Sequence, residues 1–168
     1  MAYFLVLINK RIWDSVIPGW VEQGDLHADP LGNLRISNNA LSVWDIDNEQ
    51  SNLDLVLVAL AANRQRIDKV EYGLFDQEIV SRLGIKVSDD NAQLAVPKAN
   101  SFHKNLVELS VASLASLVNE MFKHLESYFK LEDEAKQLIL AMARKQELVL
   151  ENVKEPSMRN EITELLAE

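Results

Sequence analysis

The sequence contains no cysteine, which excludes disulfide bonds, cysteine-ligated zinc and thiol catalysis. It also lacks a glycine-rich phosphate loop, and its three histidines, His27, His103 and His124, lack the close spacing typical of zinc ligands. No basic patch is present, and the formal net charge of -9 opposes binding to nucleic-acid phosphates and acidic membranes. These absences favour a binding or scaffold role over catalysis, and we predict no cofactor.

Long apolar runs are missing as well. The apolar N-terminal residues 3–8 precede Lys10 and Arg11, whereas a signal peptide carries its positive charges before the apolar run. No run approaches the roughly 20 residues of a membrane-spanning helix. We therefore expect a cytoplasmic protein with no membrane span, in which residues 3–8 form a strand buried on both faces.

The composition that remains, 48% hydrophobic and 26% charged, is typical of a soluble globular protein. Its pattern changes near residue 100, from short strand-like runs with turns to almost continuous helical periodicity. We predict an α+β fold: a small mixed or antiparallel sheet with short helices in residues 1–98, then a long helical hairpin and a short terminal helix in residues 99–168. The two parts form either one integrated domain or two closely packed halves.

Several elements of the N-terminal part have local signals. Residues 33–46 read as a hairpin around Asn38-Asn39, with Trp44 and Asp45 on opposite faces of its second strand. A helix is predicted from Ser51 or Asn52 to residue 64, a strand over 70–75, and a brief pairing of residues 85–87 with 94–96. Between them, residues 77–83 form a predicted helix with Asp76 as its N-cap and Gly84 at its end.

The C-terminal part is dominated by helical spacing. One apolar stripe runs through a predicted long helix that starts near residues 101–104, and its members are Val107, Val111, Leu114, Val118, Met121, Leu125 and Tyr128. A second helix is predicted over residues 131–150, and a last one follows Pro156. The second helix stays apolar to its end, so we expect a partner to bind at Leu148, Leu150 and Val153.

An acidic run supplies the strongest metal-binding candidate. In an extended strand Asp45, Asp47 and Glu49 would point the same way, as magnesium or calcium ligands do. The alternative is structural, because acidic residues are also favoured just before a helix, through capping and the helix dipole.

Three tryptophans lie in the N-terminal part. Trp13, Trp20 and Trp44 are candidates for lining a ligand pocket or a partner surface. The alternative is that they belong to the core, each with one polar handle.

Two further motifs suggest other chemistries. Residues 77–85 resemble the first helix and turn of a helix-turn-helix, but the acidic, turn-like residues that follow do not suit a recognition helix. Ser101 and His103 form a conceivable acyl-transfer pair, although no third group or nucleophile turn accompanies them.

The function that these features favour is a soluble, non-enzymatic adaptor or regulator that acts through helix-mediated assembly, with a protein partner or as a homodimer. Its acidic charge would suit a basic partner. The alternative is a metal-dependent enzyme or small-ligand binder that uses the acidic run. A helix-turn-helix regulator of nucleic acid is a third hypothesis.

Overall fold

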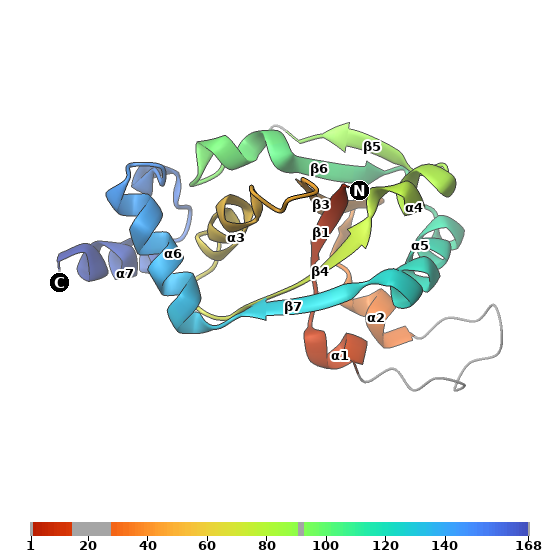
Figure 1. Cartoon of the computed structure of the whole chain (residues 1–168), viewed down its shortest axis with the longest axis horizontal. Coiled ribbons are helices and arrows are strands. Elements are labelled where there is room, and N and C mark those ends of the chain that lie inside the picture. Colours follow the sequence, from red (N-terminus) through yellow and green to blue (C-terminus); the bar gives the residue numbers. More distant parts are fainter. Residues whose placement is uncertain (1, 15–27, 91–92, 168) are drawn as a thin grey trace. The chain divides into compact units, whose positions relative to one another are not determined.

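The computed structural model describes residues 2–14, 28–90 and 93–167 (Figure 1). The strands in this part of the chain are β1 (Tyr3–Leu7), β2 (Ile36–Ser37), β3 (Ala40–Ile46), β4 (Val70–Asp76), β5 (Lys86–Asp89), β6 (His103–Val107) and β7 (Glu126–Lys130). The α-helices are α1 (Lys10–Asp14), α2 (Ala28–Asn33), α3 (Leu53–Ala61), α4 (Gln77–Arg82), α5 (Val111–His124), α6 (Glu132–Arg144) and α7 (Pro156–Ala167), and two 3-10 helices are η1 (Pro97–Phe102) and η2 (Leu150–Asn152). The predicted α+β class is confirmed.

The strands form one sheet in the order β5-β6-β3-β1-β4-β7, with β2 paired to β3. The central strand β1 is antiparallel to both neighbours, and Leu5 lies opposite Trp44 on β3 and Leu74 on β4. Successive side chains point to opposite faces of a strand. Phe4, Leu5 and Val6 are all buried, so the first strand is covered on both faces, as predicted.

The chain divides into two compact units. Unit 1 comprises residues 1–48, 71–89 and 104–128, and unit 2 comprises residues 49–70, 90–103 and 129–168. Each unit draws segments from both sides of residue 98, so the units do not coincide with the predicted parts 1–98 and 99–168. The chain crosses between them several times.

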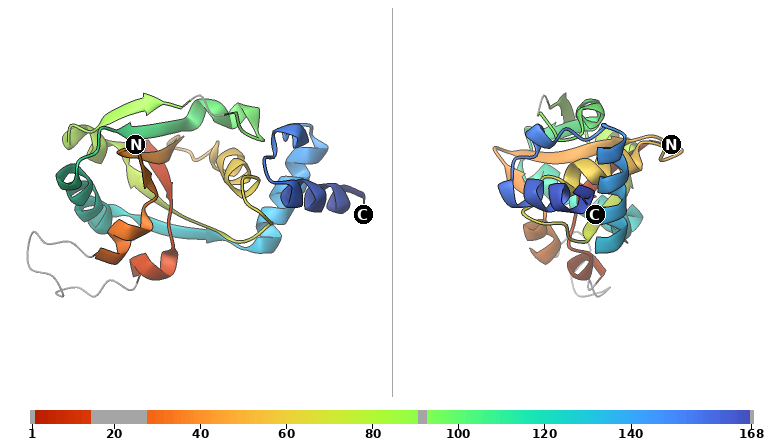
Figure 2. Two further views of the ribbon diagram at one scale, coloured as in Figure 1. Left: turned by 180° about the vertical axis from the view of Figure 1, so that it is seen from behind. Right: turned by 90° about the vertical axis from the view of Figure 1, so that its left-hand side faces the viewer.

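In unit 1 a hydrophobic core forms on the face of the sheet that carries Phe4 and Val6. Helices α1, α4 and α5 contribute Trp13, Ile79 and Met121 to this core. Figure 2 shows α5 and its neighbours from two further directions. Burial of these apolar side chains is the main stabilising contribution to the unit.

Unit 2 is helical, and α3 packs against α6, which in turn packs against α7. Ile139 of α6 and Ile162 of α7 are fully buried. Polar bonds join distant segments of the unit, because the Ile67 amide donates to Glu161 (3.0 Å) and the Val149 amide donates to the Ala95 carbonyl (2.7 Å). None of the helices described is both long and apolar enough to cross a bilayer.

The local signals of the N-terminal part predicted its elements well. Asn38 and Asn39 adopt positive φ values of 52° and 57°, and the strands on either side of this turn pair as a hairpin. A two-residue turn with this backbone matches the twist of the strands, and asparagine tolerates it. Asp76 caps α4 by accepting a hydrogen bond from the Glu78 amide (2.9 Å), and Gly84 ends the helix with a φ of 64°.

The long helix expected after residue 100 was wrong at both ends. Residues 103–107 form β6 and residues 126–130 form β7, so the helix is limited to α5. Ser110 starts α5 with a capping box, in which its hydroxyl accepts a hydrogen bond from the Ser113 amide (3.1 Å). Because β7 lies between α5 and α6 in the chain, the predicted hairpin of two directly joined helices is not confirmed.

Two smaller boundaries also differ from the sequence prediction. Strand β5 pairs with β6, with Lys86 opposite Val107, rather than with residues 94–96, which are buried without forming a strand. Helix α6 ends at Arg144 instead of residue 150, and Gln146 turns the chain with a φ of 58°. The last predicted helix is present as α7.

Candidate functional site

The described tryptophans do not line a common pocket. Trp13 is buried in the core of unit 1, where its Nε1 donates to Asn33 Oδ1 (2.9 Å) and its ring centroid lies 4.9 Å from that of Phe122. Trp44 pairs with Leu5 and therefore points to the opposite face of the sheet from Phe4. Trp20 lies outside the described residues. Trp13 thus has the core role that its single polar handle suggested.

The acidic run does not keep the extended backbone that its metal-site prediction assumed. Strand β3 ends at Ile46, and the chain then turns, with Gln50 at a positive φ of 54°, so the alternation expected for Asp45, Asp47 and Glu49 is not continued. Asp45 accepts a hydrogen bond from Gln77 Nε2 (2.6 Å), which ties β3 to the start of α4. In residues 2–14, 28–90 and 93–167, no group of three or more histidine, aspartate or glutamate residues is arranged to hold a metal ion.

The expected partner-binding residues lie largely inside unit 2. Leu148 and Val153 are buried, and Leu150 is partly buried. Helix α6 ends at Arg144, and the chain that follows is bonded to residues 94 and 95 of the same unit, since the Val149 amide donates to the Ala95 carbonyl and the Asn152 side chain donates to the Leu94 carbonyl. The apolar end of the predicted second helix therefore does not indicate that a partner binds at Leu148 or Val153.

His103 lies beside the carboxylate of Asp90, and the Ser101 hydroxyl is bonded elsewhere. Its Nδ1 lies 3.3 Å from Asp90 Oδ2, and the Asp90 amide donates to the His103 carbonyl (3.2 Å). Burial lowers the pKa of His103, and the negative charge of Asp90 partly offsets this effect. The Ser101 hydroxyl donates to the Lys98 carbonyl (3.4 Å), so it stabilises the turn of η1.

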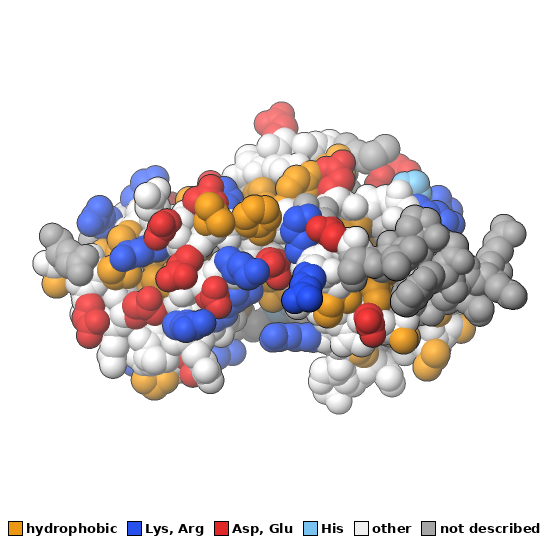
Figure 3. All heavy atoms as spheres, turned by 90° about the horizontal axis from the view of Figure 1, so that it is seen from below, with side chains coloured by type: hydrophobic (Ala, Val, Ile, Leu, Met, Phe, Trp, Pro, Cys, Tyr) orange, Lys and Arg blue, Asp and Glu red, His pale blue; other side chains and the backbone are white. Residues whose placement is uncertain are grey.

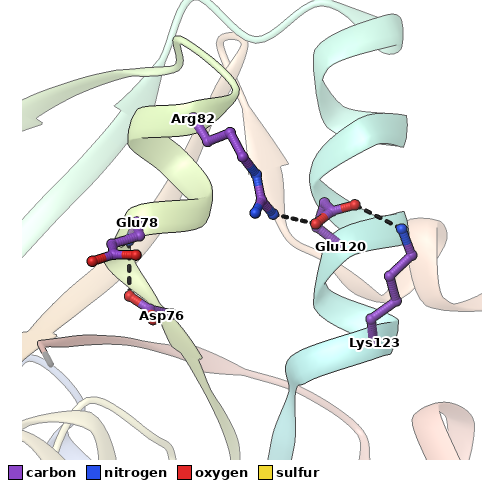
Figure 4. A network of polar contacts seen from close by, with 5 residues as sticks. All are labelled: Asp76, Glu78, Arg82, Glu120 and Lys123. Atoms are coloured by element: carbon purple, nitrogen blue, oxygen red, sulfur yellow. Dashed lines mark hydrogen bonds and ion pairs between the residues drawn. The ribbon is translucent and has the colours of Figure 1, made fainter.

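The geometry of a helix-turn-helix is absent from the described residues around α4. Strand β5 follows α4 where a recognition helix would be needed. Arg82 and Lys123 both bind Glu120, and the hydrogen bond from Lys123 is the main cause that lowers the pKa of this carboxyl (Figure 4). Both cations are thus engaged in ion pairs with Glu120. On the face drawn in Figure 3, basic and acidic side chains are interspersed.

Exposed apolar side chains gather at one edge of the sheet. Of the five large hydrophobic residues described as exposed, three lie within four positions: Tyr128 (36%), Phe129 (49%) and Leu131 (54%). Strand β7 ends the sheet order, with β4 as its neighbour (Figure 1). Tyr128 and Phe129 are consecutive and so point to opposite faces, yet both are exposed. We call residues 126–131 the edge segment, and it is the candidate site.

The two halves of the edge segment make different contacts. The Tyr128 ring stacks on Tyr72 of β4 (5.6 Å between centroids, 25° between planes), and its hydroxyl donates to the Glu126 carboxylate. Lys130 Nζ lies 3.9 Å from Asp54 Oδ1. Lys130 also borders a small apolar recess in unit 2, whose other lining residues are Leu57, Val58, Ala61, Val70, Ala135 and Leu138.

Sequence reasoning missed the edge segment because Leu125 and Tyr128 continued a helical stripe. The signal that could have found it is the adjacent pair Tyr128-Phe129, since aromatic residues favour strands.

The pairing of Tyr128 with Glu126 has a measurable consequence. The carboxylate accepts a hydrogen bond from the phenol and, with partial burial, raises the pKa of Tyr128 to about 12. We expect Glu126→Gln to lower this pKa toward the ordinary value of about 10, because the neighbouring negative charge is lost. Ultraviolet titration of tyrosinate measures the change, and Tyr128→Phe identifies the step that belongs to this residue.

The sign of the linked stability follows from the raised pKa. A phenol whose pKa is higher in the folded protein stabilises it below the unfolded pKa of about 10, and this contribution is lost as the pH rises toward 12. A Tyr128 step that is unchanged by Glu126→Gln would contradict the assigned cause.

Comparison with known proteins gives no further constraint, because no family model, no curated protein and no solved structure matches this chain.

Proposed function

We propose that the protein is a non-enzymatic interaction protein whose partner binds at the edge segment. The observation that carries this proposal is the consecutive exposure of Tyr128, Phe129 and Leu131 on and beside an edge strand. An edge strand presents unpaired backbone N–H and C=O groups, which can accept a strand from another chain. Apolar side chains on both faces of that strand are the surface such a partner would cover.

The proposal keeps the interaction role that the sequence favoured and changes its physical basis. The partner surface predicted for helix-mediated assembly lay at the end of the expected helix 131–150, whereas Leu148 and Val153 are buried. Strand addition at β7 requires only the exposed edge and supplies main-chain hydrogen bonds together with side-chain contacts.

Site-specific photocrosslinking in cells tests this proposal. A benzophenone amino acid that replaces Phe129 is expected to form a covalent adduct, since the aromatic side chain at this position would lie against the partner. The matched control is the same amino acid in place of Val87, which is 47% exposed on β5, the strand at the other end of the sheet order. Mass spectrometry of the adduct then identifies the bound chain.

The result can contradict the proposal directly. Absence of an adduct at position 129, or equal adducts at positions 129 and 87, would show that the edge segment is not a specific binding surface. We also expect Leu131→Ser to reduce the adduct at position 129, because Leu131 is exposed at the same end of β7.

A further inference from the structure

We infer that the partner at the edge segment is a second copy of this chain, joined by antiparallel pairing of β7 with β7. The inference rests on the proposed function, because it names the occupant of the same surface. Such a dimer has a two-fold axis, and each copy uses the same residues.

The charge pattern of β7 matches itself in the antiparallel direction. The strand reads E-S-Y-F-K from Glu126 to Lys130, with Tyr128 at its centre. When Tyr128 lies opposite Tyr128 of the second copy, Glu126 lies opposite Lys130, and Lys130 lies opposite Glu126. Opposite charges at facing positions stabilise a strand pair, and like charges destabilise it. Parallel in-register pairing would instead place Glu126 against Glu126.

The side chains that would meet in this pairing share one face of the strand. Glu126, Tyr128 and Lys130 are two residues apart, so they point the same way, whereas Phe129 points to the other face. Opposing aromatic rings at the two-fold axis, flanked by one ion pair on each side, form a compact cross-strand cluster. These positions follow one another within a single strand, so the match depends only on the geometry of that strand.

Lys130 retains the capacity to bind a second carboxylate. Its Nζ lies 3.9 Å from Asp54 Oδ1, at the outer limit of an ion pair, and the Asp54 side chain is 55% exposed. An ammonium group donates up to three hydrogen bonds, so a closer carboxylate from the second copy is compatible with this contact.

The other edge strand, β5, also has ends of opposite charge, but these charges have different surroundings. These charges belong to Lys86 and Asp89, and they bind one residue of the neighbouring strand β6 and the residue that follows it. Lys86 Nζ lies 2.6 Å from Glu108, and Asp89 binds Lys104. Both charges of β5 are thus held in close ion pairs within unit 1, whereas the ion pair of Lys130 with Asp54 is a long one of 3.9 Å. Val87 is the exposed apolar residue on β5. The comparison favours β7 as the self-pairing edge and makes β5 a control.

Charge exchange between two variants tests the inference. Glu126→Lys leaves two cations on the edge of each copy, and Lys130→Glu leaves two anions. We expect each variant alone to associate roughly tenfold more weakly than the wild type, because two attractive pairs become repulsive. An equimolar mixture of the two should form a heterodimer, and the double variant Glu126→Lys/Lys130→Glu should restore self-association.

Sedimentation velocity with differently labelled copies measures each case, and Lys86→Glu on β5 serves as the charge control that should leave self-association unchanged. Recovery of the heterodimer also shows that both variants are folded. A wild-type protein that stays monomeric over its soluble range, or a dimer that ignores these substitutions, overturns the inference.

Failure of self-pairing is distinguishable from failure of the proposed function. If the wild type is monomeric but position 129 crosslinks to a different protein, the second copy is excluded and the interaction surface remains. If position 129 forms no adduct at all, both proposals fall.

Discussion

Replacement of Leu117 by alanine is expected to lower the free energy of unfolding by about 2–5 kcal/mol. Leu117 is fully buried on α5 and belongs to the core that α5 forms with the sheet in unit 1. The truncation removes apolar contacts and leaves a cavity that the close-packed surroundings fill only in part. Urea denaturation followed by circular dichroism gives the loss.

A matched control lies on the same helix. Val111 begins α5 and is 81% exposed, so Val111→Ala should change the free energy of unfolding by no more than about 0.5 kcal/mol. Equal effects of the two substitutions, or a loss below about 1 kcal/mol for Leu117→Ala, would contradict the described packing of α5.

For these two residues, the structure and the sequence pattern predict opposite effects. The stripe read from spacing included Val111 and omitted Leu117, whereas the structure exposes the first and buries the second. The stripe was correct for Val118 and Met121. Periodicity therefore located a buried face but not its limits, because the helix begins later and the pattern continued into strands on either side.

Elements with short-range chemical signals were predictable. The Asn38-Asn39 turn, the Asp76 cap and the Gly84 helix end each depend on a few adjacent residues, and the structure contains all three. Such features follow from backbone preferences and local hydrogen bonds, which the sequence states directly.

Strands β6 and β7 were not predictable in the same way. Strand β6 is stabilised by pairing with β5, and Val107 finds its partner in Lys86, which is distant in sequence. Short apolar segments are ambiguous between helix and strand until such a partner is known. The serine cap at Ser110 was the one local sign that the helix begins after residue 107.

The candidate site depends on the same non-local information. Leu148 and Val153 are as apolar as a partner surface would require, but only the fold shows that unit 2 covers them. Conversely, Tyr128 and Phe129 are candidates for a binding surface only because β7 lies at the end of the sheet order. Composition identifies apolar residues, whereas topology decides which of them remain exposed.

A second large effect is expected at Gly73 of β4, which faces Leu125 at the end of α5. Gly73 lies opposite Val6 in the sheet, and a Cβ atom at this position would lie 2.6 Å from Leu125 Cδ1 and 3.0 Å from Leu125 Cγ. Gly73→Ala should therefore destabilise the protein by about 1–3 kcal/mol, because the methyl group forces Leu125 or the backbone to move. Thermal or urea unfolding measures this loss.

Two further variants test whether the contact with Leu125 causes the loss of stability in Gly73→Ala. Leu125→Ala removes the atoms that the new methyl group would meet, so Gly73→Ala should cost less in that background than in the wild type, a coupling that a double-mutant cycle detects. Gly32→Ala is the matched glycine control, because no atom lies within 4 Å of its Cβ position in α2 and alanine favours a helix by up to about 1 kcal/mol. The two glycine substitutions should thus change the free energy of unfolding in opposite directions. A Gly73→Ala loss that is unchanged by Leu125→Ala would place its origin in the backbone of β4 rather than in this contact.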